Sequence, residues 1–307
     1  MRGRPLPFPA TANSVDISIV IPSYNRGSRV TEAIQKCLSL APAPREIIIV
    51  DDHSDSDAER MLRELEHGIV KYIRLPENEG QASARSIGMA TARGKYLISL
   101  DDDSWFLEND TLQRVWNRLE ALPTCGILAL RGFSPGIPIE PSVDKLSLVA
   151  DHITCGAAYR ADVMQKTGYH LAFLRYEGEE SDLSIKVIDA GFDIVLDESI
   201  RFFHDYNPAT RSSTTLANVR RLAVRNDLLR AWIYFPVDLA IALTLWRSVS
   251  HCIWGIRQNA IGATLRGYAG FFAFFAEAVR HRRPVQRSAA LKYLTLRRRP
   301  RPLQHEE

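Results

Sequence analysis

The sequence predicts an α/β fold with a mainly parallel sheet, flanked by helices and followed by a helical extension. Three observations support this. Runs of β-branched residues alternate with helical stretches over the first hundred residues, as in βαβ units. Polar and acidic residues directly follow the predicted strands, at the edge where such sheets bind ligands. Beyond Pro208 the pattern changes to arginine-rich helices.

The strands and helices of the first half follow one another closely. The run 17–21 is β-branched and closed by Pro22, which suits a buried parallel strand. The second strand ends on Asp51-Asp52 and the fourth on Asp101-Asp102-Asp103. We expect strands at 17–21, 46–50, 69–74 and 95–100, and helices at 31–40, 58–66 and 81–91.

The second half is less regular. Proline and glycine recur without periodicity over 132–150, which predicts an irregular loop. A helix is expected at 181–190, stopped by Gly191, and a strand at 193–196. Helical patterns then run from about 215 to 293. The chain therefore divides into an N-terminal tail (1–14), a catalytic domain (15–207) and a basic helical region (208–307).

Charge is distributed unevenly along the chain. Residues 1–200 carry 21 Lys and Arg against 30 Asp and Glu, a net charge of −9, whereas residues 201–307 carry 18 against 6, a net charge of +12. The acidic part can hold cations, and the basic part can face phosphates or anionic lipid.

Four scattered cysteines without a CxxC spacing argue against a disulfide framework or a zinc site and favour a reducing compartment. The first 14 residues lack the apolar core of a signal peptide. No uninterrupted apolar stretch of about 18 residues occurs, so no membrane-spanning helix is expected. These features predict a cytoplasmic protein.

Two acidic clusters and a histidine are candidates for the chemistry. Asp101-Asp102-Asp103 is a solvated turn or, at the carboxyl end of a parallel strand, a site where Asp101 and Asp103 share a divalent cation. Glu179, Glu180 and Asp182 either complement a helix dipole or supply a base for an acceptor hydroxyl. His204, which follows both clusters, is structural or a third metal ligand.

Six segments of the chain combine into a specific pattern. They are ISIVIPSYNR (17–26), EIIIVDDHS (46–54), NEGQASARSIGMATARGKYLISLDDDS (78–104), CGAAYRADVMQKTGY (155–169), GEESDLSIKVIDAGFDI (178–194) and FFH (202–204). Each motif alone is weak, but their shared order and spacing over about 15–205 is specific. In this order and spacing the chain resembles glycosyltransferase family 2, which has the GT-A fold, a Rossmann-like α/β architecture.

The resemblance implies an inverting enzyme that moves a sugar from a nucleotide diphosphate to an acceptor hydroxyl with the help of Mg²⁺ or Mn²⁺. The second acid of the family's Glu-Asp pair is the base, which here is Glu180, although Glu179 beside it leaves the register open by one. The implied catalytic group is Glu180, Glu179 and Asp182, and the implied metal ligands are Asp103, Asp101 and His204. The implied nucleotide-sugar site is Pro22, Ser23, Tyr24, Asn25, Asp52, Arg85, Asp101, Asp102, Gly156 and Ala157.

The family also suggests a setting, the synthesis of a surface polysaccharide or glycolipid with a saccharide or lipid-linked acceptor. Two other functions stay open: a nucleotidyltransferase of related fold, and an inactive membrane-bound binder of nucleotide sugars. The glycine-rich N-terminal loop of nucleotidyltransferases is replaced here by IPSYNR.

The basic C-terminal region has two interpretations. Its helices pack on the catalytic domain with solvated arginines, or they lie on the inner face of the cell membrane with aromatics in the lipid boundary and arginines on anionic headgroups. Pro236 and Asp238 interrupt the first of its two apolar stretches, 231–246, and the second is 268–278. Nucleic acid is not an expected partner, because no nucleic-acid module accompanies the charge.

Overall fold

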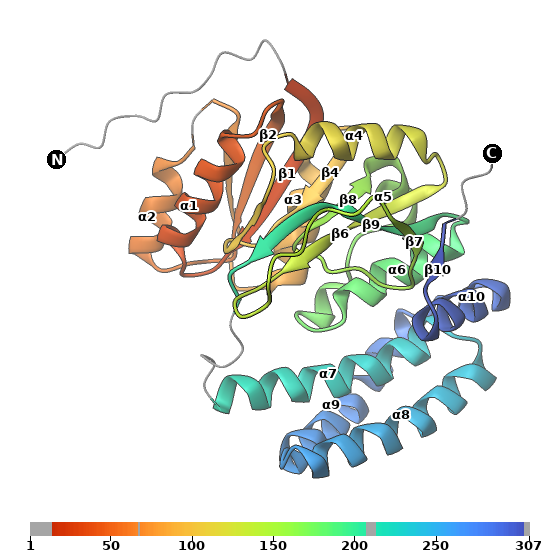
Figure 1. Ribbon diagram of the computed structural model, residues 1–307. Coiled ribbons are helices and arrows are strands. Elements are labelled where there is room, and N and C mark those ends of the chain that lie inside the picture. The colour runs from red at the N-terminus through yellow and green to blue at the C-terminus, as the bar shows by residue number, and fades with distance from the viewer. Residues whose placement is uncertain (1–13, 67, 207–212, 304–307) are drawn as a thin grey trace.

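The computed structural model describes residues 14–66, 68–206 and 213–303. A ten-stranded sheet forms its centre, and a layer of long helices lies against one side of it (Figure 1). The strand order is β10-β7-β9-β6-β8-β4-β1-β2-β3, with β5 paired to β9 outside this path. The predicted α/β architecture with a C-terminal helical extension is confirmed.

The first half of the chain forms the parallel part of the sheet. Strands β1, β2, β3 and β4 run parallel, and each of the first three is followed by a helix, as the βαβ pattern predicted. The elements are β1 (Ser14–Ser23), α1 (Gly27–Leu38), β2 (Ala43–Asp51), α2 (Ser56–Glu64), β3 (Val70–Arg74), α3 (Gln81–Thr91) and β4 (Tyr96–Ser99).

Both faces of this sheet are covered. Val20, Ile48 and Val50 pack with α3 and with helices from later in the chain, whereas Ile19, Ile47 and Ile49 pack with α1 and α4 (Thr111–Ala121). Because successive strand residues point to opposite faces, a strand buried on both sides must be apolar throughout. The carboxyl-terminal edge of the strands remains open to bind a ligand.

The second half adds antiparallel strands. Strand β8 runs antiparallel to both β4 and β6, and β9 is parallel to β6 but antiparallel to β5 and β7. These elements are β5 (Ser104–Phe106), β6 (Cys125–Phe133), β7 (Leu146–Leu148), β8 (Ala157–Arg160), α5 (Ala161–Thr167), a 3₁₀ turn (Ala172–Leu174), α6 (Glu179–Asp189) and β9 (Asp193–His204).

Two sequence predictions are corrected here. The segment 132–150 is not wholly irregular, because it contains β7, whose three residues are too few to show alternation and depend on pairing with β9. The strand expected at 193–196 continues to His204, which carries that histidine to the edge where β4 ends.

The C-terminal region consists of four helices and a short strand. They are α7 (Ser213–Tyr234), α8 (Val237–Arg257), α9 (Ile261–Arg280), α10 (Arg287–Arg298) and β10 (Arg301–Pro302). Strand β10 pairs with β7, and Lys292 of α10 forms an ion pair with Asp193, so this region also builds the catalytic sheet. The proposed boundary at 207/208 and nearly all of the tail 1–14 lie outside the described residues.

Helix α8 is a candidate for a membrane span that the sequence analysis did not expect. Its length of 21 residues and mean hydropathy of 1.3 over an 18-residue window are sufficient for a span, and 17% of that window is buried. Pro236 is the N-cap of α8 and Asp238 lies in its first turn, so neither residue interrupts the middle of the helix. The helix also continues beyond residue 246, where the apolar stretch read from the sequence ended. Among the described helices, α8 alone meets these criteria, which rest on length and composition.

Candidate active site

A cleft of about 720 Å³ opens at the carboxyl ends of the strands, against the N-terminal half of α7. Residues from four segments of the chain meet there, because the ends of β1, β2 and β4 lie side by side and β9 brings His204 to the same edge. The predicted site residues that line it are Pro22, Ser23, Tyr24, Asp52, Asp101, Asp102, Asp103 and His204.

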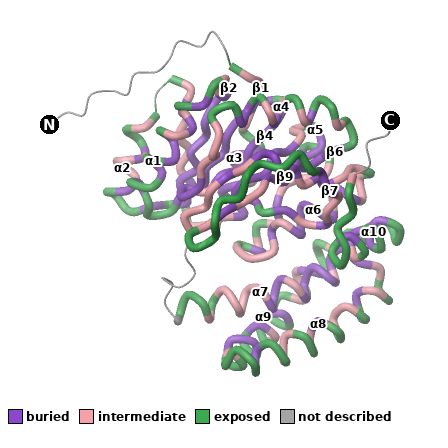
Figure 2. The backbone as a smooth tube through the Cα atoms, viewed as in Figure 1, coloured by how far each residue is buried: buried purple, intermediate pink, exposed green. Residues whose placement is uncertain are grey.

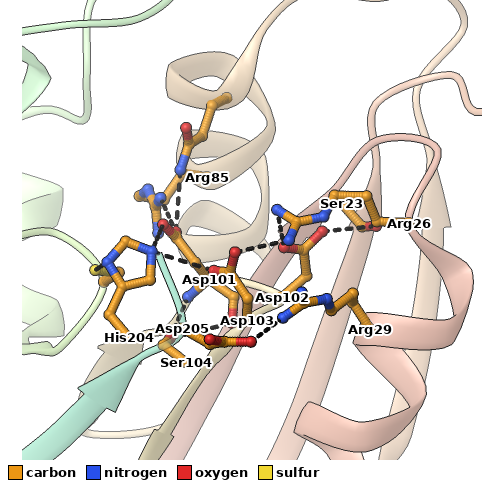
Figure 3. Close-up of polar contacts among 12 residues, drawn as sticks. Ser23, Arg26, Arg29, Arg85, Asp101, Asp102, Asp103, Ser104, His204 and Asp205 are labelled. Carbon is orange, nitrogen blue, oxygen red and sulfur yellow. Dashed lines mark hydrogen bonds and ion pairs between the residues drawn. The ribbon is translucent and has the colours of Figure 1, made fainter. Parts of the chain in front are cut away.

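Arg26 binds two of the three adjacent aspartates (Figure 3). Its Nη1 lies 2.8 Å from Oδ1 of Asp102, and its Nη2 donates to Oδ2 of Asp103 at 2.7 Å. Burial raises the pKa of Asp102 to about 7; Arg26 opposes this shift and the charges of Asp103 and Asp101 add to it. The cluster therefore keeps an excess of negative charge that a bound cation would relieve.

Asp103 and His204 face each other at the end of this cluster. The Nε2 atom of His204 lies 3.1 Å from Oδ1 of Asp103 and 3.7 Å from Oδ2 of Asp101. Although burial opposes it, hydrogen bonds from His204 and Arg26 lower the pKa of Asp103. Two carboxylates and one imidazole within this distance form a donor set that fits a divalent cation such as Mn²⁺ or Mg²⁺.

Cys155 contacts His204, and the sequence analysis did not predict it as a site residue. Its Sγ lies 3.3 Å from Nδ1 of His204, and one donor atom each of Asp101, Cys155 and His204 lie within 4.8 Å of one another. In the tautomer whose proton lies on Nδ1 and points to Cys155, His204 would offer the lone pair of Nε2 to a cation instead of donating to Asp103. The sequence signal was the CGAAY segment, in which Cys155 precedes the two residues predicted to line the sugar pocket.

Arg85 is buried beneath the aspartates. Its Nη2 donates to Oδ1 of Asp101 at 2.7 Å, Nη1 binds Ser99, and the side chain is 1% exposed. The charge of Arg85 also acts on Glu179 and Glu180, whose pKa values it lowers against the effect of burial. Arg85 thus links the strand-end aspartates to the α6 acids from below and does not line the cleft.

The three acids at the start of α6 differ in their surroundings. Asp182 is fully buried, and its oxygens accept hydrogen bonds from the Leu171 N–H, Lys186 and Tyr234, so this side chain serves the structure. Burial raises the pKa of Glu180, which is partly exposed, and burial and the charge of Glu180 raise that of Glu179 well above its usual range. Neither glutamate lines the cleft itself.

Helix α7 holds the segment that leads into α6. The amide of Asn226 donates to the carbonyl oxygens of Leu174, Tyr176 and Glu177 at 3.0, 2.8 and 2.8 Å. The Nη1 of Arg230 donates to the Gly178 carbonyl at 3.0 Å, so close that a Cβ at Gly178 would lie 1.6 Å from it. The C-terminal region thus holds in place the segment that leads directly to Glu179, Glu180 and Asp182 of α6.

The residues that the sequence predicts to bind the nucleotide include both accessible and structural side chains. Tyr24 is 49% exposed, and the Asp52 carboxylate accepts the N–H groups of Glu79 and Gly80 at 2.7 and 2.9 Å. Asn25 ties two loops together, since its N–H donates to Ser54 and its side chain accepts from the Asp55 N–H. Asn25 does not line the cleft but supports it. The predicted nucleotide residues that do line it are Pro22, Ser23, Tyr24, Asp52, Asp101 and Asp102.

Gly156 and Ala157 are buried behind the residues that the sequence predicts as metal ligands. Gly156 has φ +150°, and a Cβ there would lie 2.3 Å from the Phe202 ring, so no larger residue fits without displacing β9. Ala157 begins β8 and pairs with Ser99 of β4. Neither residue lines the cleft; both bring Cys155 close to His204.

Among solved structures, the chain is similar to the mannosyltransferase PcManGT from Pyrobaculum calidifontis, in complex with GDP-Man and Mn²⁺. The TM-score is 0.59 at 15% identity, covering 95% of this chain and 83% of the other. With the strand order and the aspartates at the end of β4, this likeness defines the fold class as GT-A.

Sequence comparison adds the family. The family described as "Glycosyl transferase family 2" matches residues 18–142. The chain is 34% identical over 103 residues to an uncharacterized glycosyltransferase of Haemophilus influenzae, covering 33% of this chain and 41% of the relative. It is 24% identical over 204 residues to the succinoglycan biosynthesis protein ExoO of Rhizobium meliloti, covering 64% and 56%. The match covers less than half of the chain, so residues 18–142 are similar to glycosyl transferase family 2. It spans about half the length of these curated relatives.

Proposed function

We propose that this protein transfers a sugar from a nucleoside diphosphate to an acceptor hydroxyl, with inversion at the anomeric carbon. The observation that carries the proposal is the cleft at the strand ends, where three aspartates, Arg26 and His204 lie opposite the nucleotide-facing residues Tyr24 and Asp52. The similarity of residues 18–142 to glycosyl transferase family 2 and the binding of GDP-Man by PcManGT support a nucleotide-sugar donor.

The residues of the cleft suit the departure of a nucleoside diphosphate. Asp101, Asp103 and His204 would hold a divalent cation, which supplies positive charge where the leaving diphosphate develops its negative charge. Mn²⁺ in the PcManGT complex supports this assignment. The Arg26 side chain is 42% exposed and lies beside the proposed cation site, so its guanidinium can supply a second positive charge to the leaving diphosphate.

Inversion follows from a single displacement. The acceptor oxygen attacks the anomeric carbon, the bond from that carbon to the diphosphate oxygen breaks with its electron pair, and the hydroxyl proton passes to a carboxylate. Glu180 is the proposed base, because it is the partly exposed member of the pair and burial raises its pKa toward the range useful for proton transfer. The buried Glu179 would keep a proton beside it.

The acceptor class follows from the relatives and the helical region. A relative named for succinoglycan biosynthesis supports a role in surface polysaccharide or glycolipid synthesis, with a saccharide or lipid-linked acceptor. Much of α8 is exposed (Figure 2). Its exposed residues include an apolar stripe, which supports attachment to the inner face of the cell membrane and consists of Ile241, Leu245, Val249, Ile253 and Ile256. Arg247, which places a charge near the middle of α8 and is paired with Asp227, favours a helix that lies on the membrane surface.

A matched pair of variants tests the base. Glu180→Gln keeps the shape of the side chain but cannot take the proton, so kcat should fall by about 10²–10⁴-fold while donor affinity survives. Glu179→Gln should have the smaller effect. Both are measured with a panel of nucleoside diphosphate sugars, following release of the nucleoside diphosphate with Mn²⁺ present and absent. A loss in Glu179→Gln alone would move the base by one residue, and no turnover of any donor by the wild type would contradict the proposed activity.

A further inference from the structure

A second hollow, which we call the helical groove, lies between α7, α8 and α10, away from the catalytic cleft. Its volume is about 500 Å³. It shares no lining residue with the cleft among the described parts of the chain, because the two use different stretches of α7. The groove is lined by Asp227, Leu239, Ala242, Leu243, Trp246, Arg247, Ser250, His251, Leu294, Arg297 and Arg298.

The floor of the helical groove is a charge cluster centred on Asp227. Nη1 of Arg247 lies 2.9 Å from Oδ1 of Asp227, Nη2 of Arg230 lies 3.1 Å from the same atom, and Nε2 of His251 lies 3.1 Å from Oδ2. The Arg247 side chain is only 6% exposed. Two guanidinium groups therefore share one carboxylate in a largely desolvated place, which leaves positive charge that Asp227 does not neutralise.

The rim adds further positive charge. Arg297 and Arg298 of α10 line the opening, where Arg297 lies 3.8 Å from Asp151 and Arg298 forms no ion pair with any described residue. Arginine pairs are well suited to the oxygens of a phosphate group. The groove thus offers a phosphate several guanidinium donors at different depths.

One wall of the groove is apolar and continues onto the outside of the protein. Leu239, Leu243 and Leu294 line it, and Trp246, 61% exposed, stands between the groove and the α8 stripe. A ligand that contacts both the arginines and the apolar wall has a phosphate at one end and an apolar chain at the other. Free phosphate would leave the apolar wall unused, whereas a membrane phospholipid would fill both.

We propose that the helical groove binds the phosphate headgroup of a single anionic phospholipid, with its apolar chain running over Trp246 to the α8 stripe. This inference rests on the membrane attachment proposed above and adds to it a defined lipid site, separate from the acceptor site. Diffuse attraction of arginines to a charged surface needs no groove and would treat all exposed arginines alike.

The test uses a soluble lipid, so that membrane attachment and groove binding are measured apart. Dihexanoyl phosphatidic acid, dihexanoyl phosphatidylcholine and inorganic phosphate are titrated into the full chain below the micelle concentration and followed by calorimetry. The variant Arg297→Gln/Arg298→Gln is compared with Arg299→Gln/Arg301→Gln, which removes equal charge from arginines outside the groove. Ala242→Trp fills the groove without changing charge.

We expect dihexanoyl phosphatidic acid to bind the wild type more tightly than the other two probes. Arg297→Gln/Arg298→Gln and Ala242→Trp should each weaken it by about tenfold or more, and the control pair by less than about twofold. Equal losses in the two arginine pairs, or equal affinity for inorganic phosphate, would overturn the inference. Binding to phosphatidylglycerol vesicles is measured as well. If the protein binds these vesicles but not the short-chain lipid, the groove inference is overturned and the proposed membrane attachment stands. If it binds neither the vesicles nor the short-chain lipid, both proposals are contradicted.

Discussion

The strand-end site and the helical groove combine the same kinds of side chain in opposite proportions. At the strand ends, three adjacent aspartates are paired with Arg26 and Arg85. In the groove, Asp227 is paired with Arg230, Arg247 and His251. The first cluster is left with excess negative charge and the second with excess positive charge.

This difference indicates the ligand that each site can accept. A partly buried cluster gains most from a ligand that neutralises its excess charge, because the low surrounding polarity strengthens the interaction. The aspartates therefore suit a cation and the groove suits an anion. The same contrast appears along the sequence, with net charges of −9 before and +12 after residue 200.

The largest expected effect comes from weakening the acidic cluster. Asp103→Asn removes one carboxylate from the proposed cation site but keeps an oxygen that can accept from Arg26. Transfer should fall by about 10³-fold, because a bound cation contributes several kcal/mol to the transition state. Mn²⁺-dependent donor binding is measured by calorimetry. Asp205→Asn, whose carboxylate instead pairs with Arg29, is the control. Full activity of Asp103→Asn in excess chelator would show that the strand-end aspartates do not act by binding a cation. The charge difference between this cluster and the groove would then not explain their ligands.

The same substitution in the cation-rich cluster should act on stability. Asp227→Asn leaves Arg230 and Arg247 without their counter-charge, and breaking a buried pair in this way costs about 3 kcal/mol in the free energy of unfolding. Urea unfolding measures the loss. Asp238→Asn, which breaks an exposed pair with Arg287, should leave stability unchanged. Equal unfolding curves for the two variants would show that the Asp227 cluster is not held by charge.

The smallest effect is expected at Cys155. Cys155→Ala removes the partner of His204 Nδ1 and should weaken Mn²⁺ binding by about 10–100-fold, the usual effect of losing a group that orients a metal-binding histidine. Cys155→Ser keeps an acceptor and should recover most of the affinity. Cys37→Ala, which removes a buried thiol from the core, is the control for packing. Unchanged Mn²⁺ affinity in Cys155→Ala would mean that His204 is oriented by the aspartates.

The sequence predicted the parallel half of the sheet well, because β1, β2 and β4 are apolar and largely buried, and each of the first three strands is followed by its own helix. It did not predict the pairing of β6, β7 and β8, which depends on contacts between distant residues. Leu146–Leu148, for example, is a strand because β9 and β10 pair with it on its two sides.

The candidate site, like the sheet, was predicted only in part. Asp101, Asp103 and His204 were identified from motifs, and the structure brings them together. Arg26 and Cys155 were missed, since each acts through a partner 77 or 49 residues away in sequence. The contribution of Asn226 and Arg230 was also hidden, because the carbonyl groups that they hold carry no sequence signal.

Strand β10 has a consequence for the order in which the protein can fold. It pairs with β7, and the Leu303 N–H donates to the Leu146 carbonyl at 3.0 Å. During synthesis, β7 remains an open sheet edge until residue 303 has left the ribosome, although most of the sheet is already available. Open edges can pair with other chains. We therefore expect nascent chains to depend on chaperones in this interval, and high contact order to slow the final step of folding.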